Sequence, residues 1–211
     1  EEHFRNRIIT QTCIIERGGL KFGFFSLLGK VAVENAAFAS PVTFSKQVST
    51  AKKLVKQLRK EGCDVVICLS HSGVDPDGSG GWKGEDVELA EKVKGIDVII
   101  SGHTHSVIDK RLIVNGVPVV QAGDYGRYVG KLSLVYENGK VKTESEDLIA
   151  VDDKIAGDAI IQGAIEEQKK LIDSEILKPL GLEYSEAIAE TDFRLECNEQ
   201  GDVEASNLGP F

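Results

Sequence analysis

Three of the four histidines follow two apolar runs of strand length, and this clustering is the strongest chemical signal in the sequence. His71 follows the run DVVICLS in the motif SHSG, and His103 and His105 follow the run IDVII in the motif SGHTH. Gly102 lets the backbone approach closely, so two histidines one residue apart can bring both imidazoles into one cavity. Imidazole is a ligand for Zn, Mn, Fe, Co and Ni. The pattern predicts that all three histidines are metal ligands rather than polar residues of ordinary loops.

The surrounding elements predict that both histidine motifs lie at one edge of a parallel sheet. From Ser45 to Gly62 apolar residues recur every three or four positions, which indicates an amphipathic helix with Ser45 as its N-cap. A buried strand at 64–70, a Gly-rich loop, the helix GEDVELAEKVKG and a second buried strand at 96–100 follow. A strand–helix–strand unit gives a right-handed parallel pair whose carboxyl ends share an edge, where sites are built in open α/β sheets.

The remaining elements are predicted to be a hairpin before this unit, and further strands and a helix after it. The glycine turn at 17–19 separates two β-rich runs and indicates the hairpin. Beyond residue 106 the apolar period becomes two, with Asn-Gly turns, which predicts an antiparallel meander. Its strands are 107–114, 117–122, 129–136 and 140–148. Helical spacing returns from Lys154 to Leu180, and 186–196 has the pattern of a strand.

Composition and charge narrow the classes of function. The 211 residues include 25 Lys plus Arg and 34 Asp plus Glu, a net charge of −9 that argues against binding to nucleic acid. Hydrophobic residues make up 41% and charged residues 28%, which is enough to build a folded core. No apolar run reaches the roughly 18–20 residues of a transmembrane helix. The four cysteines contain no Cys-x-x-Cys pair, so neither a zinc ribbon nor a disulfide scaffold is predicted.

Three segments of the sequence resemble a known family of hydrolases. CDVVICLSHSG, GEDVELAEKVKGIDVIISGHTH and VVQAGDYGRYVGKLSLVY resemble the calcineurin-like metallophosphoesterases, and among them the 5′-nucleotidase and UDP-sugar hydrolase family. The resemblance implies an α/β fold, a four-layer α/β/β/α sandwich with two divalent metal ions at its strand ends. It implies that His71 and His103 ligate one metal ion and His105 the other, with Zn, Mn, Co, Fe and Ni as candidates. The QAG turn at 121–123 would lie at the edge of the site.

The resemblance also implies a division of the chain into three parts. Residues 1–150 would be the second half of the catalytic domain, 151–183 a linker helix, and 184–211 the beginning of a C-terminal substrate-binding domain. The family's Asp-x-His motif, bridging Asp and Gly-Asn-His motif do not occur in the sequence. The chain contains no Met and opens on Glu1, so we expect a fragment or a processed chain that holds half of a two-metal site.

Three further features have competing interpretations. Arg127 follows the QAG turn, where it would either contact a phosphate group or simply place a charge on a strand edge. Asp75 and Asp77 lie in DPDGSG, which resembles a calcium loop in composition but lacks the downstream Glu of an EF-hand, so a solvated turn is favoured. Trp82 is a candidate for stacking on a base, although anchoring of the loop is favoured.

The function implied by the resemblance is metal-dependent hydrolysis of phosphomonoesters, with a 5′-nucleotide as the leading substrate and metal-activated water as the nucleophile. UDP-sugar hydrolysis, 2′,3′-cyclic nucleotide phosphodiesterase activity and sulfur-ester hydrolysis are alternatives on the same fold. An inactive half-site used for binding, or one subunit of a split enzyme, are alternatives of another class. The expected partner is a small nucleotide or nucleotide sugar. Since the family is largely periplasmic, secreted or surface-attached, one of these locations is expected, whereas oligomeric state stays open.

Overall fold

The computed structural model describes residues 10–192, and the chain divides into two compact units between Lys154 and Ile155. The first unit contains every described strand, together with helices α1, α2 and α3. The second unit contains helix α4 and the short helical turns that follow it. Both histidine motifs of the sequence therefore belong to the first unit.

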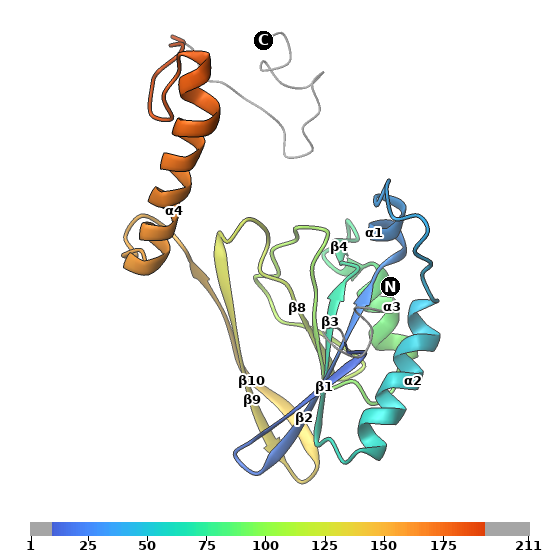
Figure 1. Cartoon of the computed structure of the whole chain (residues 1–211). Coiled ribbons are helices and arrows are strands. Elements are labelled where there is room, and N and C mark those ends of the chain that lie inside the picture. The colour runs from blue at the N-terminus through green and yellow to red at the C-terminus, as the bar shows by residue number, and fades with distance from the viewer. Residues whose placement is uncertain (1–9, 193–211) are drawn as a thin grey trace. The chain divides into compact units, whose positions relative to one another are not determined.

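A six-stranded sheet with the order β1-β2-β3-β6-β8-β7 forms the centre of the first unit (Figure 1). Strands β2, β3, β6 and β8 are parallel to one another, and the edge strands β1 and β7 are antiparallel to their neighbours. The strands span Thr12–Arg17 (β1), Leu20–Leu28 (β2), Val65–His71 (β3), Val98–Ile100 (β6), Leu112–Val114 (β7) and Val117–Val120 (β8). The predicted first hairpin and the predicted parallel pair of buried strands are confirmed.

Helices α2 and α3 pack on one face of this sheet, because each carries a stripe of apolar residues (Figure 1). Helix α2 spans Gln47–Lys60 and α3 spans Glu85–Lys92, while the short α1 spans Lys30–Glu34. The buried apolar residues of α2 and α3 are Ala51, Leu54, Val55, Leu58, Leu89 and Ala90. They form one core with the inward side chains of the sheet, which fixes both helices relative to the ends of β3 and β6.

The N-terminus of α2 differs from the prediction. Lys46, not Ser45, occupies the N-cap position, and no side chain caps the first turn. The hydroxyl of Ser49 instead donates to the carbonyl of Lys46 at 2.9 Å. The helix is stabilised mainly by its buried apolar stripe, since four of its residues are buried, so it forms without a capping side chain.

A separate hairpin covers the other face of the sheet. Strand β9 spans Tyr128–Glu137 and β10 spans Lys140–Ala150, and they form a two-stranded sheet joined at Asn138-Gly139. The hairpin packs Leu132, Leu134, Tyr136 and Val141 against Val65, Ile67 and Val98 of the central sheet. Helices, sheet and hairpin thus form successive α, β and β layers, as expected for a partial four-layer sandwich (Figure 1).

The predicted antiparallel meander is wrong as one four-stranded sheet, although its first two and its last two strands do pair antiparallel. Strand β8 lies parallel to β6, with Ile99 opposite Val119, and β7 pairs with β8. Strands β9 and β10 pair with each other in their own sheet. The two-residue period of apolar residues correctly indicated extended strands. This period shows which residues share a face of a strand, but it does not specify which strand is the neighbour.

The Gly-rich loop between β3 and α3 is a small hairpin rather than a calcium loop. Strands β4 (Asp75–Pro76) and β5 (Trp82–Lys83) pair antiparallel. Between them Asp77 Oδ1 accepts hydrogen bonds from the backbone N–H groups of Ser79 at 2.7 Å and Gly81 at 2.9 Å, and these bonds lower the pKa of Asp77. Trp82 packs against the core, so both favoured interpretations, a solvated turn and a loop anchor, agree with the structure.

The second unit begins at Ile155 and contains the helix that the sequence predicts. Helix α4 spans Ala159–Ile172, where the Asp158 carboxylate accepts from the N–H of Ile160 at 2.8 Å, and it continues through Asp173–Leu177 (η1) and Lys178–Leu180 (η2). The strand predicted at 186–196 is wrong over 186–192, because no described strand pairs with that segment, and 193–196 lie outside the described residues. No helix between residues 10 and 192 is long and apolar enough to cross a bilayer.

Candidate functional site

The structure brings His71 and His103 together at the edge of the parallel sheet. His71 is the last residue of β3, and His103 lies in the loop that follows β6. The two strands are neighbours, with Leu69 opposite Ile100, so their carboxyl ends lie side by side. The ring centroids of His71 and His103 are 5.0 Å apart, and the ring planes are inclined at 59°. The SHSG and SGHTH motifs therefore lie side by side at one edge of the sheet, as predicted.

This spacing suits two ligands of one metal ion. A Zn–N distance of about 2.0–2.1 Å puts each ring centroid roughly 3 Å from the ion, so two imidazoles on one tetrahedral ion lie roughly 5 Å apart. The observed separation is 5.0 Å. Over residues 10–192, however, no group of three or more His, Cys, Asp or Glu side chains could hold a metal ion. The described part of the chain thus offers a pair of imidazoles rather than a complete coordination sphere.

The buried carboxylate of Asp86 ties the two histidine loops together. Asp86 is the second residue of α3 and is 0% exposed. It accepts hydrogen bonds from the hydroxyls of Ser70 and Ser101, both at 2.6 Å, and from the N–H of Gly73 at 3.1 Å. Burial raises the pKa of Asp86, and the hydrogen bonds from Ser101, Ser70 and Gly73 oppose that effect. A single side chain therefore fixes the residues that precede His71 and His103.

The two loops also contact each other directly. The hydroxyl of Thr104 donates to the carbonyl of Val74 at 2.8 Å, and the hydroxyl of Ser106 donates to the same oxygen at 2.6 Å. Gly73 has φ +94°, and a Cβ atom added there would lie 2.2 Å from Cγ2 of Thr104. Only glycine fits at this position, both for its backbone conformation and for its space.

Gln121, which the sequence placed at the edge of the site, forms hydrogen bonds to the loop that contains His103 and His105. Its side chain is 3% exposed. In the amide orientation that satisfies its neighbours, Nε2 donates to the Ser101 hydroxyl at 3.0 Å, and the carbonyl oxygen accepts from the N–H groups of His105 at 3.1 Å and Ser106 at 2.9 Å. The network that begins at Asp86 therefore extends through Ser101 to the backbone of His105.

His105 lies beside different partners from those of the other two histidines. Its Nδ1 atom is 3.6 Å from Oδ2 of Asp124, and its ring meets the edge of the Tyr125 ring at a centroid distance of 5.4 Å. His103, His105 and Tyr125 have φ values of 81°, 57° and 49°. Left-handed backbone at residues other than glycine costs on the order of 1–3 kcal/mol, and such residues cluster at functional sites.

Arg127 forms an ion pair with Asp124. Its Nε atom is 3.6 Å from Oδ1 of Asp124, and its N–H donates to the Asp124 carbonyl at 3.0 Å. Its side chain is about half exposed, whereas that of Asp124 is 7% exposed. The predicted contact of Arg127 with a phosphate group remains a prediction.

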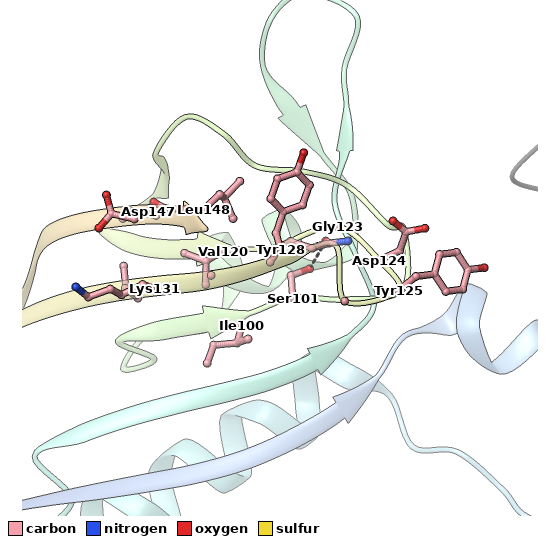
Figure 2. Close-up of a pocket in the computed structure, with 16 residues that line it drawn as sticks. Ile100, Ser101, Val120, Gly123, Asp124, Tyr125, Tyr128, Lys131, Asp147 and Leu148 are labelled. Atoms are coloured by element: carbon pink, nitrogen blue, oxygen red, sulfur yellow. Dashed lines mark hydrogen bonds between the residues drawn. The ribbon is translucent and has the colours of Figure 1, made fainter. Parts of the chain in front are cut away.

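A cavity of about 520 Å³ opens beside Asp124, between the central sheet and the β9–β10 hairpin (Figure 2). Ile100 and Val120 line it from the central sheet, and Lys131, Asp147 and Leu148 line it from the hairpin. Two carboxylate oxygens of the lining, Oδ2 of Asp124 and Oε2 of Glu146, are buried without a hydrogen-bond partner. Burial raises the pKa of Glu146.

Sequence reasoning missed Asp86 and Asp124. Asp86 could have been found, because it precedes Leu89, Ala90 and Val93 by three, four and seven residues and so lies on the apolar stripe of α3. A carboxylate on a buried stripe requires hydrogen-bond donors. Asp124 carries no comparable signal, since it follows the QAG turn among polar and aromatic residues.

Comparisons with known proteins show which family this part of the chain is similar to. Residues 7–107 match the family described as Calcineurin-like phosphoesterase. The trifunctional nucleotide phosphoesterase YfkN of Bacillus subtilis is 32% identical over 140 residues, covering 64% of this chain and 9% of that protein. The 2′,3′-cyclic-nucleotide 2′-phosphodiesterase/3′-nucleotidase of Salmonella typhimurium is 26% identical over 206 residues, covering 84% of this chain and 32% of that protein.

A solved structure shows the same fold. The crystal structure of a 5′-nucleotidase precursor from Thermus thermophilus superimposes with a TM-score of 0.67 at 20% identity, covering 84% of this chain and 37% of that one. The central sheet, its helices and the hairpin thus match the metallophosphoesterase fold. The chain spans about a tenth to a third of the length of the two curated relatives.

Replacing Gly73 with Ala tests the contact between the two loops. Gly78→Ala is the matched control, because Gly78 has a similar φ of +83° but nothing within 4 Å of an added Cβ. Both variants bear the cost of a left-handed alanine, and Gly73→Ala must also displace Thr104. We expect it to lose about 1–3 kcal/mol more than Gly78→Ala in urea denaturation. Equal losses would show that the loops are not packed as described.

Replacing Asp86 with Asn tests the buried carboxylate. Because its pKa is raised above the ordinary 3.8, the folded chain keeps the Asp86 proton to a higher pH than the unfolded chain does. This contribution to stability is therefore present below pH 3.8 and is lost as pH rises through the folded pKa. The side chain of the Asn variant cannot titrate. The urea midpoint of this variant should therefore increase relative to that of the wild type as pH rises. A difference between the midpoints that is independent of pH would contradict the assignment.

Proposed function

Residues 7–107 of the chain belong to the calcineurin-like phosphoesterase family, and from this premise we propose that the chain is part of a metal-dependent phosphomonoester hydrolase acting on nucleotides. One observation carries the proposal: the imidazoles of His71 and His103 lie 5.0 Å apart at the ends of two neighbouring parallel strands. That spacing suits a shared divalent ion, and divalent ions are general in this family. Hydrolysis of a 5′-nucleotide to a nucleoside and phosphate is the leading reaction.

The proposed ligands are the three histidines at the sheet edge. His71 and His103 would hold one ion, and His105 would contribute to a second. Zn, Mn, Co, Fe and Ni all accept imidazole ligands, so the donor set suits several ions without selecting one. Because no larger ligand group lies within residues 10–192, carboxylate and amide ligands from elsewhere in the protein would complete the two sites.

Divalent ions at this position would lower the pKa of a water molecule and offset the charge on a phosphoryl group. The residues of this chain supply positioning. The Asp86 hydrogen bonds to Ser70 and Ser101 hold the ends of β3 and β6, so the backbone beside both imidazoles is in place before any ligand binds. Preorganised groups avoid the cost of reorientation during the reaction. Arg127, at the exposed side of Asp124, would contact a phosphate oxygen through its planar guanidinium group.

Nucleotides are the favoured substrate class because the names of both curated relatives specify nucleotide phosphoesters. The Salmonella typhimurium relative makes 2′,3′-cyclic nucleotides a specific second candidate. UDP-sugar hydrolysis is a third within the same chemistry. We assign the choice among them to a C-terminal domain that would begin at residues 184–211, after the linker helix of 151–183. A periplasmic, secreted or surface location belongs to the same proposal.

A binding protein with an inactive half-site is the alternative from another class. It follows from the absence of the Asp-x-His and Gly-Asn-His motifs from the sequence. Metal stoichiometry separates the two proposals: a complete enzyme takes up two ions, whereas three imidazoles without carboxylate ligands should hold at most one ion weakly.

Replacing His71 or His103 with Ala tests the metal pair. In calorimetric titration with Zn²⁺ each substitution should weaken binding by at least the roughly 10–100-fold that loss of an outer-shell partner causes. In the complete protein His103→Ala should also lose most phosphate release from a 5′-nucleotide. His3→Ala is the control, since His3 is the remaining histidine and has no part in the proposal. Wild-type Zn²⁺ affinity and turnover in a folded His103→Ala protein would contradict the proposed function.

A further inference from the structure

We propose that Asp124 is the positioning residue of His105: its carboxylate accepts a hydrogen bond from Nδ1–H and thereby leaves Nε2 free to bind a metal ion. This inference rests on the proposed function, because it assigns a second residue to the metal ligand His105. In the chain without metal, His105 then carries its proton on Nδ1.

The first support is the unexplained burial of Asp124. Its side chain is only 7% exposed, and Oδ2 is inaccessible and makes no hydrogen bond in the described part of the chain. A buried carboxylate oxygen without a donor is costly, and such groups in folded proteins usually have a functional reason. The surroundings of Oδ2 should therefore contain the donor that it serves.

His105 is a candidate for this donor. Oδ2 of Asp124 lies 3.6 Å from Nδ1 of His105, while Oδ1 lies 3.6 Å from Nε of Arg127. The two oxygens thus face two different cationic or donor groups. A separation of 3.6 Å is too long for a hydrogen bond, so the two atoms are close but not bonded in this structure. Hydrogen bonds of this kind commonly tighten when the ligand of the site binds.

The backbone holds both residues in this arrangement. The loop of His105 and the loop of Asp124 are joined by the N–H of Gly123, which donates to the carbonyl of Ser106 at 3.1 Å. Next to this bond Val107 and Ala122 form an antiparallel bridge. The rings of His105 and Tyr125 meet edge to face, so His105 is held between Tyr125 and Asp124. The two loops are therefore held together by their backbone, and the Asp124 side chain between them is buried.

The contact between Asp124 and His105 can select which nitrogen of the imidazole is protonated. A neutral imidazole has one protonated and one unprotonated nitrogen, and a carboxylate beside Nδ1 favours the proton there. The lone pair of Nε2 then points away from the carboxylate, and metal-binding histidines usually donate their other N–H in this way. The His105 side chain is 47% exposed, so an ion can reach it. No ion pair of the described residues joins His71 or His103 to a carboxylate in this way.

The test compares the wild type with Asp124→Asn, Asp124→Ala and the control Asp147→Asn, which removes a more exposed carboxylate from the lining of the same cavity. Nitrogen-15 NMR of the metal-free chain should show His105 protonated on Nδ1 in the wild type and in the control. In Asp124→Ala it should shift toward Nε2–H. Calorimetric titration of the full protein with Zn²⁺ should show a loss of affinity of about 10–100-fold for both Asp124 variants and none for the control.

Stability separates positioning from a structural role. Asp124→Asn keeps one side-chain oxygen that can face Arg127 and removes the buried anionic Oδ2 that lacks a hydrogen-bond donor. Its melting temperature should therefore equal or exceed that of the wild type while its Zn²⁺ affinity falls. A fall in melting temperature with unchanged affinity would identify a structural carboxylate and overturn the inference. So would an Nε2–H tautomer of His105 in the wild type.

The two proposals fail in different ways. If the wild-type protein takes up no Zn²⁺, the proposed function fails whatever the Asp124 variants do. If Zn²⁺ binds with equal affinity to the wild type and to both Asp124 variants, the function stands and the role of Asp124 is refuted.

Discussion

The geometry of the sheet edge depends on the hydrogen bonds to one buried carboxylate. Asp86 accepts from Ser70 at the end of β3, from Ser101 after β6 and from Gly73 in the following loop. Since β3 and β6 are parallel neighbours, the carboxylate joins two loops that are far apart in the sequence. An apolar side chain at residue 86 would leave buried donors unpaired, at about 1–3 kcal/mol each. This arrangement holds the backbone that carries the two histidines.

Much of the fold could be predicted because its strongest signals are local. The stripe of α2 and the apolar runs of β3 and β6 each specify an element and its buried face. The pairing of β8 with β6 could not be predicted in this way, because the apolar run at 117–120 fits a parallel neighbour as well as an antiparallel one. The strand expected at 186–192 fails for a related reason: an extended pattern becomes a strand only when a partner lies beside it.

The part of the candidate site that lies at the ends of the parallel strands could be predicted from the sequence. Parallel strands bring His71 and His103 to one edge, and the structure shows the pair. Two carboxylates were beyond the sequence patterns because their roles depend on burial. Asp86 has a detectable position on the stripe of α3, whereas Asp124 becomes conspicuous only when Oδ2 is found buried and unpaired 3.6 Å from His105. The assignment of all three histidines as ligands remains a prediction.

The most direct test of the central claim, that His71 and His103 hold one ion, is a crystal structure of the chain grown with Zn²⁺ and measured at the zinc absorption edge. We expect an anomalous peak between the two rings, about 2.0–2.1 Å from one nitrogen of each. Zinc bound at full occupancy elsewhere, with neither imidazole as a ligand, would contradict it. The fold would be unaffected by that result, but the proposed metal chemistry would lose its basis.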